Sequence, residues 1–355
     1  MNKKVVGLVA GLLFCFGAIA NEAEEAEVGV GIGGLEEPGL TPALPAPKAA
    51  ENQLLGIAQA GNALVAVGKQ GVILRSENGS DWQQKNSPVS VMLTNVEFAS
   101  PKLGFVIGYD SVILKTSDGG ENWKLVNYDA EGNQLFDLLM LDEQRGIAVG
   151  GYGTQFLTTD GGDSWELVEN DLSDIGMHLN VVVQLKDATG RLYVAGERGM
   201  MGLSEDDGRT WKVLDSPYGG SFFGAINKGV RGVLLYGMRG NVYSADDLDA
   251  CATVDAETWD PYERDIDPPA ERVAELGWKK HKTPVKESMF GGTVTDKGRI
   301  ILVGINGTTF TMSREGESIE QVKTNLPETL TGLIEYKDRL LAVGRRGVQE
   351  MEIQP

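Results

Sequence analysis

The sequence predicts an all-β chain folded as a seven-bladed β-propeller with four-stranded blades, on three observations. Short runs rich in Val, Ile, Leu and Phe alternate with turn residues, as in chains built of short strands. A turn motif that ends in Trp recurs once per unit in the first half of the chain. A glycine closes an apolar run seven times, at steps of 40 to 46 residues and one of 67: Gly68, Gly108, Gly150, Gly196, Gly237, Gly304 and Gly344. Units of about 40 to 45 residues are typical of propeller blades.

The second unit shows the four strands most clearly. We expect the innermost strand at Val91–Phe98, the second at Gly104–Gly108, the third at Ser111–Lys115 and the outer one at Trp123–Val126. Each is short, apolar and bounded by Gly, Asp, Asn or Ser, which are turn residues.

The recurring motif reads Ser/Thr-x-Asp-x-Gly-x-x-Trp. It occurs at Thr116–Trp123, Thr158–Trp165 and Ser204–Trp211, with a shortened copy at Ser76–Trp82. Its aspartate can accept backbone N–H groups of its own turn, its glycine can supply a positive φ, and its tryptophan can pack between sheets. A calcium site or a catalytic carboxylate is the alternative. Recurrence at equivalent turns favours a structural role.

Length and charge limit the function. The chain has 355 residues, 41% of them hydrophobic, which suffices for one large domain. Its net charge of −19 argues against a nucleic-acid partner, because binding phosphates needs a basic surface.

The N-terminus reads as a targeting signal. Residues 1–20 have a basic start, an apolar run and an Ala18-Ile-Ala20 cleavage pattern, so we expect a signal peptide and a periplasmic protein. Cleavage would leave Cys251 as the one cysteine, which cannot form an internal disulfide. Cys251 is either a reactive thiol or a bystander in a loop.

Two segments depart from the repeat. Residues 21–50 are acidic, then Gly-rich, then Pro-rich, so we expect a tether before a propeller at 51–355. The last unit lacks an outer strand, and the segment near Leu40–Lys48 could close the ring by supplying it. An insertion at about 246–277 interrupts blade five, with a short helix expected within Pro268–Gly277. This insertion is either a partner-specific lobe or variable decoration.

Candidate binding residues fall in the turns between second and third strands, which share one face with the connectors between blades. They are Lys69, Tyr109, Tyr152, Arg198, Arg239, Arg345 and Arg346. Such a basic rim could bind a carboxylate or an acidic peptide, or the turns could be ordinary solvated ones. Connector residues that include Phe136, Phe223 and Phe290 are expected to form an apolar floor inside the rim. Basic rim and apolar floor together suit an extended peptide or a protein surface.

Catalysis has little support in the sequence. His178 and His281 are the only histidines, too few for a metal cluster or a Ser-His-Asp arrangement, so no catalytic residue, metal or cofactor is predicted. A sialidase-like glycoside hydrolase or a glycan-binding propeller is the alternative, with Tyr109 or Tyr152 as a candidate nucleophile.

The chain resembles the photosystem II stability and assembly factor-like propellers. The resemblance lies in the Asp-box motifs (the neuraminidase-type repeat) and in Leu64–Gly71, Gly104–Trp123 and Leu341–Gly347. It implies a secreted, non-catalytic scaffold that binds a membrane protein, or an extended soluble segment of one, through arginines that correspond here to Arg198, Arg239, Arg345 and Arg346. Proteobacterial relatives often accompany export pumps, which makes a component of such a pump a possible partner. We expect a monomer.

Overall fold

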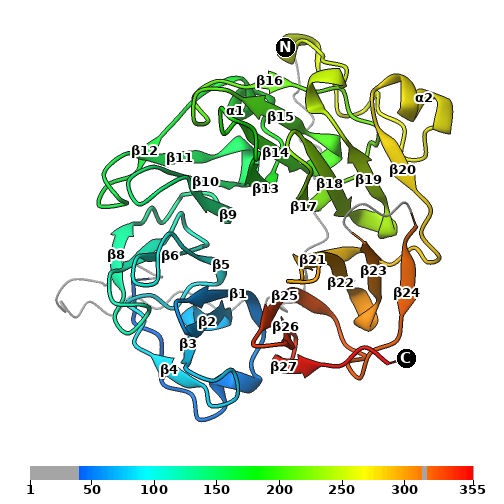
Figure 1. Cartoon of the computed structure of the whole chain (residues 1–355). Coiled ribbons are helices and arrows are strands. Elements are labelled where there is room, and N and C mark those ends of the chain that lie inside the picture. The colour runs from blue at the N-terminus through cyan, green and yellow to red at the C-terminus, as the bar shows by residue number, and fades with distance from the viewer. Residues whose placement is uncertain (1–39, 314–317, 355) are drawn as a thin grey trace, which may run out of the picture. The chain divides into compact units, whose positions relative to one another are not determined.

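The computed structural model describes residues 40–313 and 318–354, and these form a ring of seven antiparallel sheets (Figure 1). Six of the sheets have four strands and the seventh has three. The prediction of an all-β, seven-bladed propeller is confirmed. The predicted signal peptide at 1–20 and most of the predicted tether at 21–50 lie outside the described residues. No helix in the described ranges is long and apolar enough to cross a membrane.

Blades one to four follow the predicted order from the axis outward. Blade one comprises β1 (Leu54–Ala60), β2 (Ala63–Gly68), β3 (Ile73–Ser76) and β4 (Gln83–Lys85). Blade two comprises β5 (Leu93–Phe98), β6 (Gly104–Gly108), β7 (Ile113–Thr116) and β8 (Lys124–Asn127). Blade three comprises β9 (Leu135–Met140), β10 (Gly146–Gly150), β11 (Gln155–Thr158) and β12 (Glu166–Leu167), followed by α1 (Asp171–Ile175). Blade four comprises β13 (Leu179–Gln184), β14 (Leu192–Gly196), β15 (Met201–Ser204) and β16 (Lys212–Val213).

Blades five to seven complete the ring. Blade five comprises β17 (Phe222–Lys228), β18 (Gly232–Gly237), β19 (Val242–Ala245) and β20 (Lys279–His281). Blade six comprises β21 (Met289–Val294), β22 (Arg299–Gly304), β23 (Thr309–Ser313) and β24 (Glu320–Val322). Blade seven comprises β25 (Leu330–Tyr336), β26 (Arg339–Gly344) and β27 (Gly347–Met351).

The Asp-box turns act as structural staples, as expected. In blade two, Thr116 Oγ1 donates to Asp118 Oδ1 at 2.8 Å and accepts the N–H of Gly120 at 3.1 Å. Gly120 has φ +87°, and a Cβ there would lie 2.7 Å from Val65 of blade one. Trp123 packs with Val65 and the core of its own blade, so the motif joins neighbouring sheets. The same hydrogen bonds recur around Asp160 and Asp206.

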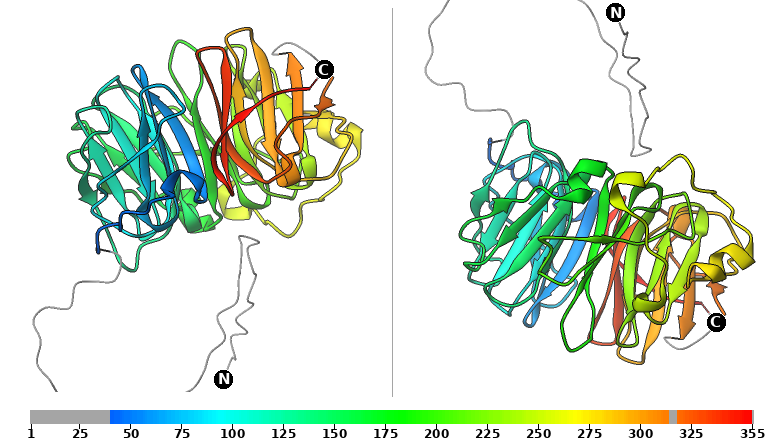
Figure 2. Two further views of the ribbon diagram at one scale, coloured as in Figure 1. Left: turned by 90° about the horizontal axis from the view of Figure 1, so that it is seen from below. Right: turned by 90° about the horizontal axis from the view of Figure 1, so that it is seen from above.

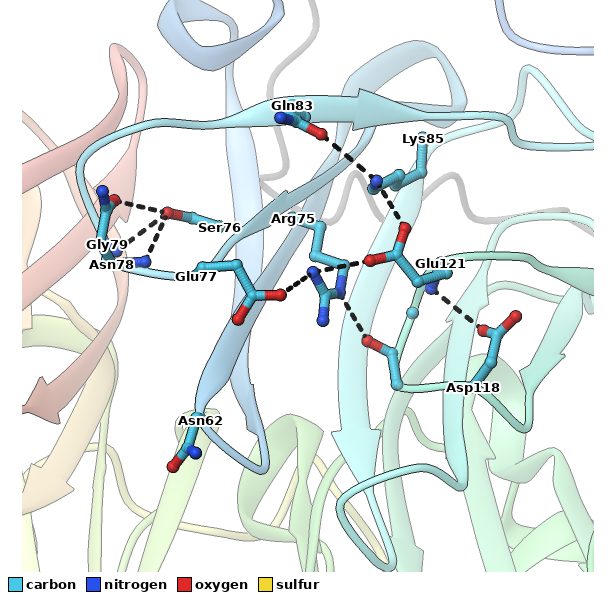
Figure 3. A network of polar contacts seen from close by, with 12 residues as sticks. Asn62, Arg75, Ser76, Glu77, Asn78, Gly79, Gln83, Lys85, Asp118 and Glu121 are labelled. Carbon is cyan, nitrogen blue, oxygen red and sulfur yellow. Dashed lines mark hydrogen bonds and ion pairs between the residues drawn. The ribbon is translucent and has the colours of Figure 1, made fainter.

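Ion pairs on this face also join neighbouring blades (Figure 3). Arg75 of β3 binds Glu121 of the next Asp box at 2.8 Å and donates from Nε to the Gly119 carbonyl at 2.9 Å. Lys85 of β4 binds the same Glu121 carboxylate at 2.7 Å. Equivalent pairs link later blades: Lys115 with Asp163, Arg145 with Asp207, and Arg191 with Asp249.

The predicted closing strand is wrong. Residues 40–48 form no strand and run past the outer side of blade one instead, where Ala43 N–H donates to Ser87 O at 3.1 Å and Gln84 Nε2 donates to Leu44 O at 3.0 Å. The outer edge of β27 is covered at both ends by other backbone. A Cβ on Gly347 would lie 1.7 Å from the carbonyl oxygen of Ala50, in the 3₁₀ turn η1 (Ala49–Glu51), and residues 323–325 pair with 352–354.

The ring closes through side chains instead of a shared sheet. Tyr336 of blade seven donates its hydroxyl to the carbonyls of Asn62 and Glu77 in blade one, at 2.5 and 3.0 Å. Thr331 donates to Leu54 O at 2.9 Å, and Tyr336 and Leu341 share an apolar cluster with Leu64. Blade seven is therefore joined to blade one by side chains on the face of its sheet, and no N-terminal strand is added to its edge.

The blade-five insertion packs on blade four, and it lies on the outer side of the ring (Figures 1 and 2). Thr253 bridges Leu214, and Val254 N–H donates to Val213 O at 3.1 Å, so the insertion extends the outer edge of that sheet. Trp259 is buried in the core between blades three and four. The expected helix is confirmed as α2 (Ala270–Glu275) and is followed by Gly277 at φ +85°. Burial raises the pKa of Cys251 to about 12, which makes its thiol a poor nucleophile.

Candidate partner-binding face

The turns between second and third strands share one construction in all seven blades. The first residue of each turn donates its N–H to the connector that leads into the innermost strand of the same blade, for example Lys69 to Gln53 O at 3.1 Å and Met238 to Ser221 O at 2.9 Å. These turns and the connectors therefore lie on the same face, opposite the Asp boxes. The structure brings all seven predicted site residues to this face, and their binding role stays a prediction.

Six of these turns hold their middle residue in the left-handed conformation. The six residues are Gln70, Asp110, Tyr152, Arg198, Arg239 and Asn306, with φ between +51° and +60°. This conformation costs an L-residue about 1 to 2 kcal/mol. In five of the six turns the next residue is a glycine pressed against a connector, such as Gly71, where a Cβ would lie 2.0 Å from Val89 O, and in blade two it is Ser111. The backbone turn is fixed by this close packing, and the middle residue is left at the outside of the turn.

The cations of this face differ in their partners. Lys69, Arg198, Arg239 and Arg345 form no ion pair with any carboxylate in residues 40–313 and 318–354. Arg346 pairs with Glu328 at 3.0 Å. Four cations are thus available to a ligand's carboxylates, for which guanidinium groups are well shaped.

Arg198 has a neighbour that the sequence did not indicate. Its guanidinium lies 4.7 Å from the ring centre of Tyr262, which comes from the blade-five insertion and is 71% exposed. Gly219 N–H donates to Asp265 O at 2.8 Å, so the insertion also touches the connector between blades four and five. No sequence pattern gives the path of an insertion, which is why this contact could not be predicted.

An aromatic group lies between the rim and the central channel. Tyr152 is 60% exposed and stands edge-on to His178 at 4.7 Å, and Phe136 lies 5.7 Å from the same imidazole. The backbone N–H of Tyr152 donates to His178 Nδ1 at 3.0 Å, which assigns the imidazole proton to Nε2. Phe223 and Phe290 meet at 5.3 Å. These rings form part of the expected apolar floor, whereas Phe222, Met289 and Leu330 are fully buried between blades.

The innermost strands enclose a cavity of about 340 Å³ on the ring axis. Each of the seven strands carries a bulge near its start, so that one extra residue per blade faces the axis. Side chains in this region join neighbouring blades: Thr94 donates to Leu135 O at 2.6 Å and Asn180 donates to Phe222 O at 2.8 Å.

Two carboxyl groups near the axis have perturbed pKa values. Burial, and secondarily the charge of Asp137, raises the pKa of Glu97 to about 8. Burial raises the pKa of Asp137 to about 6 against the opposing effect of three N–H donors. Neither residue was singled out from the sequence, although each is an acidic residue inside an apolar strand, a pattern that can mark a functional carboxylate.

The sialidase-like alternative finds no supporting geometry in the described parts of the chain. Burial raises the pKa of Tyr109, which disfavours the phenolate that a tyrosine nucleophile needs. Neither Tyr109 nor Tyr152 has its hydroxyl bonded to a carboxylate there. Within residues 40–313 and 318–354, no group of three or more His, Cys, Asp or Glu could hold a metal ion.

Comparison with known proteins gives one family and a common fold. The sequence model of the family described as Photosynthesis system II assembly factor YCF48 matches residues 74–300. A structure of YCF48 bound to D1 peptide is similar with a TM-score of 0.63 and 14% identity, over 89% of this chain and 100% of that one. YCF48 from Cyanidioschyzon merolae gives a TM-score of 0.60 and 15% identity, over 88% of this chain and 98% of that one.

The WD40 β-propeller domain of Doa1 gives a TM-score of 0.60 at 12% identity, over 88% of this chain and 95% of that one. Identities this low show the fold alone. No curated protein matches the sequence.

Proposed function

Because this chain belongs to the Photosynthesis system II assembly factor YCF48 family, we propose that it is a non-catalytic scaffold that binds another protein through the face of its second-to-third-strand turns. The observation that carries this proposal is the set of four cations on that face that have no carboxylate partner in residues 40–313 and 318–354. Because the chain as a whole is acidic, with a net charge of −19, four such cations on one face give that face a charge complementary to an acidic ligand.

The occupant we propose is an extended acidic segment of a membrane protein. One relative in the family has been solved with a D1 peptide bound, which supports a peptide as the form of the ligand. Half-exposed aromatic rings of the connectors on the same face suit the apolar side chains of such a segment. We also propose that residues 1–20 direct the chain to the periplasm as a monomer, where a component of an export pump is a candidate partner.

Charge reversal on the face tests this function. The variant Arg198→Glu/Arg239→Glu should lower recovery of the partner from membrane extracts by about tenfold or more, because each reversal turns an attraction into a repulsion. The matched control is Lys124→Glu/Lys212→Glu, which makes the same charge change on exposed outer-strand positions. Equal recovery by both variants would contradict the proposal. Turnover of a fluorogenic sialoside by the wild-type chain would contradict the non-catalytic assignment.

A further inference from the structure

The axial cavity carries a second inference, which rests on the proposed function. All seven innermost strands contribute to its wall, and the residues at their bulges are Leu55, Thr94, Phe136, Asn180, Phe223, Phe290 and Thr331. Three of these seven are phenylalanines. The cavity therefore combines aromatic rings with the polar side chains and backbone of the bulges.

Asp137 gives this wall an acceptor that is not fully used. Its Oδ1 accepts from Asn95 Nδ2 at 2.7 Å and from Leu138 N at 2.9 Å, and its Oδ2 accepts from Val182 N at 2.8 Å. A carboxylate offers about four acceptor positions, so one remains on Oδ2. No described Lys or Arg forms an ion pair with Asp137, and burial without a cation is the physical reason for its raised pKa.

Tyr236 gives the same wall a second polar group. The residue is 6% exposed and lines the cavity, and its hydroxyl forms no hydrogen bond within residues 40–313 and 318–354. The ring lies over Gly224 and Gly292, both in the cavity wall, where a Cβ at Gly224 would be 2.1 Å from the phenol oxygen. A hydroxyl in a cavity wall that makes no hydrogen bond within the described chain can form one with a ligand in the cavity.

We propose that this cavity binds one cationic side chain, lysine or arginine, of the partner's segment. Its methylene groups pack against Phe136, Phe223 and Phe290, as the apolar stems of long cationic side chains do. Its charged end binds Asp137 Oδ2 and donates to the Tyr236 hydroxyl, and the phenyl rings add cation–π attraction. The segment thus places acidic residues on the rim and a single cation on the axis.

A metal ion fits the cavity less well. Calcium takes six or more oxygen ligands and magnesium requires octahedral geometry, whereas Asp137 keeps a single acceptor position open. A cationic side chain needs only the two polar contacts that the wall offers, and its apolar stem uses the rings that a metal ion would not.

Small probes test the cavity apart from the rim. We expect acetyl-arginine amide or acetyl-lysine amide to bind the intact chain saturably in titration calorimetry and ligand-observed NMR. The neutral matches, acetyl-citrulline amide and acetyl-norleucine amide, should bind about tenfold more weakly or not at all. Equal binding of charged and neutral probes, no saturable binding of either cation, or displacement by Ca²⁺ would overturn the proposal.

Substitutions in the cavity test which residues contact the cationic probe. Asp137→Asn should weaken binding of the cationic probe by about tenfold, and Tyr236→Phe by about two- to fivefold. Tyr236→Phe removes a hydroxyl that makes no hydrogen bond within the described residues, so this variant should fold. It therefore tests the proposed cavity even if Asp137→Asn does not fold. The rim variant Arg198→Glu/Arg239→Glu should bind the probe as the wild type does. Loss of the partner without loss of the probe separates failure of the rim from failure of the cavity.

Discussion

The two faces of this propeller use their cations in opposite ways. On the Asp-box face, Arg75, Lys115, Arg145 and Arg191 each bind a carboxylate of the next blade. On the opposite face, Lys69, Arg198, Arg239 and Arg345 have no such partner in the described chain. The difference is partly local in origin, since Asp boxes supply Glu121, Asp163 and Asp207 to cations of the preceding blade, whereas Glu197 and Asp110 of the opposite turns form no ion pair with Lys69, Arg198, Arg239 or Arg345 in the described chain. The ion pairs of one face therefore contribute to stability, and the other face is the one that we propose for binding.

We expect the largest effect on stability when an Asp-box tryptophan that packs between two blades is removed. Trp123→Ala should lower the free energy of unfolding by about 3 to 5 kcal/mol, because a large ring is lost between two blades. Chemical denaturation measures this loss, with the exposed neighbour Lys124→Ala as control. Partner recovery at 25 °C should be unchanged as long as the variant stays folded. A decrease in the free energy of unfolding of less than about 1 kcal/mol would show that Trp123 does not hold the two blades together.

The pH dependence of stability distinguishes the Asp-box face from the channel. The folded pKa of Glu97 is raised from 4.5 to about 8, so its contribution is fully present below pH 4.5 and is lost as the pH rises to about 8. The pKa of Glu121 is lowered, chiefly by its hydrogen bond from Lys85, so its contribution is present above its unfolded pKa and is lost as the pH falls.

Two glutamine variants test these opposite slopes by denaturation between pH 3 and pH 9. Glu97→Gln keeps an acceptor for Met140 N–H and should stabilise the chain by about 2 to 4 kcal/mol at pH 9, with no gain at pH 4. Glu121→Gln should lose stability only at the higher pH values. A Glu97→Gln curve parallel to that of the wild type would show that this carboxyl is not perturbed in solution.

The smallest effect compares one cation from each face. Arg75→Met should cost about 1 to 2 kcal/mol, since the Arg75 side chain is 13% exposed and three acceptors lose their donor. Arg198→Met should change the free energy of unfolding by less than about 0.5 kcal/mol, yet lower partner recovery. Equal stability losses in the two variants would mean that the faces do not differ as described.

The local sequence pattern is sufficient to predict the blades, but it does not predict how the ring of blades closes. Gly68, Gly108 and their equivalents mark the second-to-third-strand turns because only a short apolar strand followed by such a turn repeats at that spacing. The prediction that Leu40–Lys48 supplies the outer strand of blade seven rests on the strand missing from the last unit and on distance along the chain. Its path along Gln84 and Ser87 depends on backbone contacts between residues far apart in sequence, which no local pattern encodes.

The candidate site likewise has one part that the sequence predicts, the rim, and one part that it does not, the channel. The rim residues could be placed from the sequence because their turns repeat, and the repeat fixes which face they share. The channel groups were missed, although Asp137 and Glu97 each interrupt an apolar strand. Their significance depends on what faces them across the axis, and Tyr236 reaches the cavity from a different blade.

By itself, the sequence determined the number of blades, the strand order within them and the face on which the glycine turns lie, because these follow from short-range periodicity and turn chemistry. Only the tertiary structure decided how the ring closes, where the insertion packs and which charges remain without a partner. Those features arise from contacts between blades, where shape and burial select the neighbours and sequence distance carries no information.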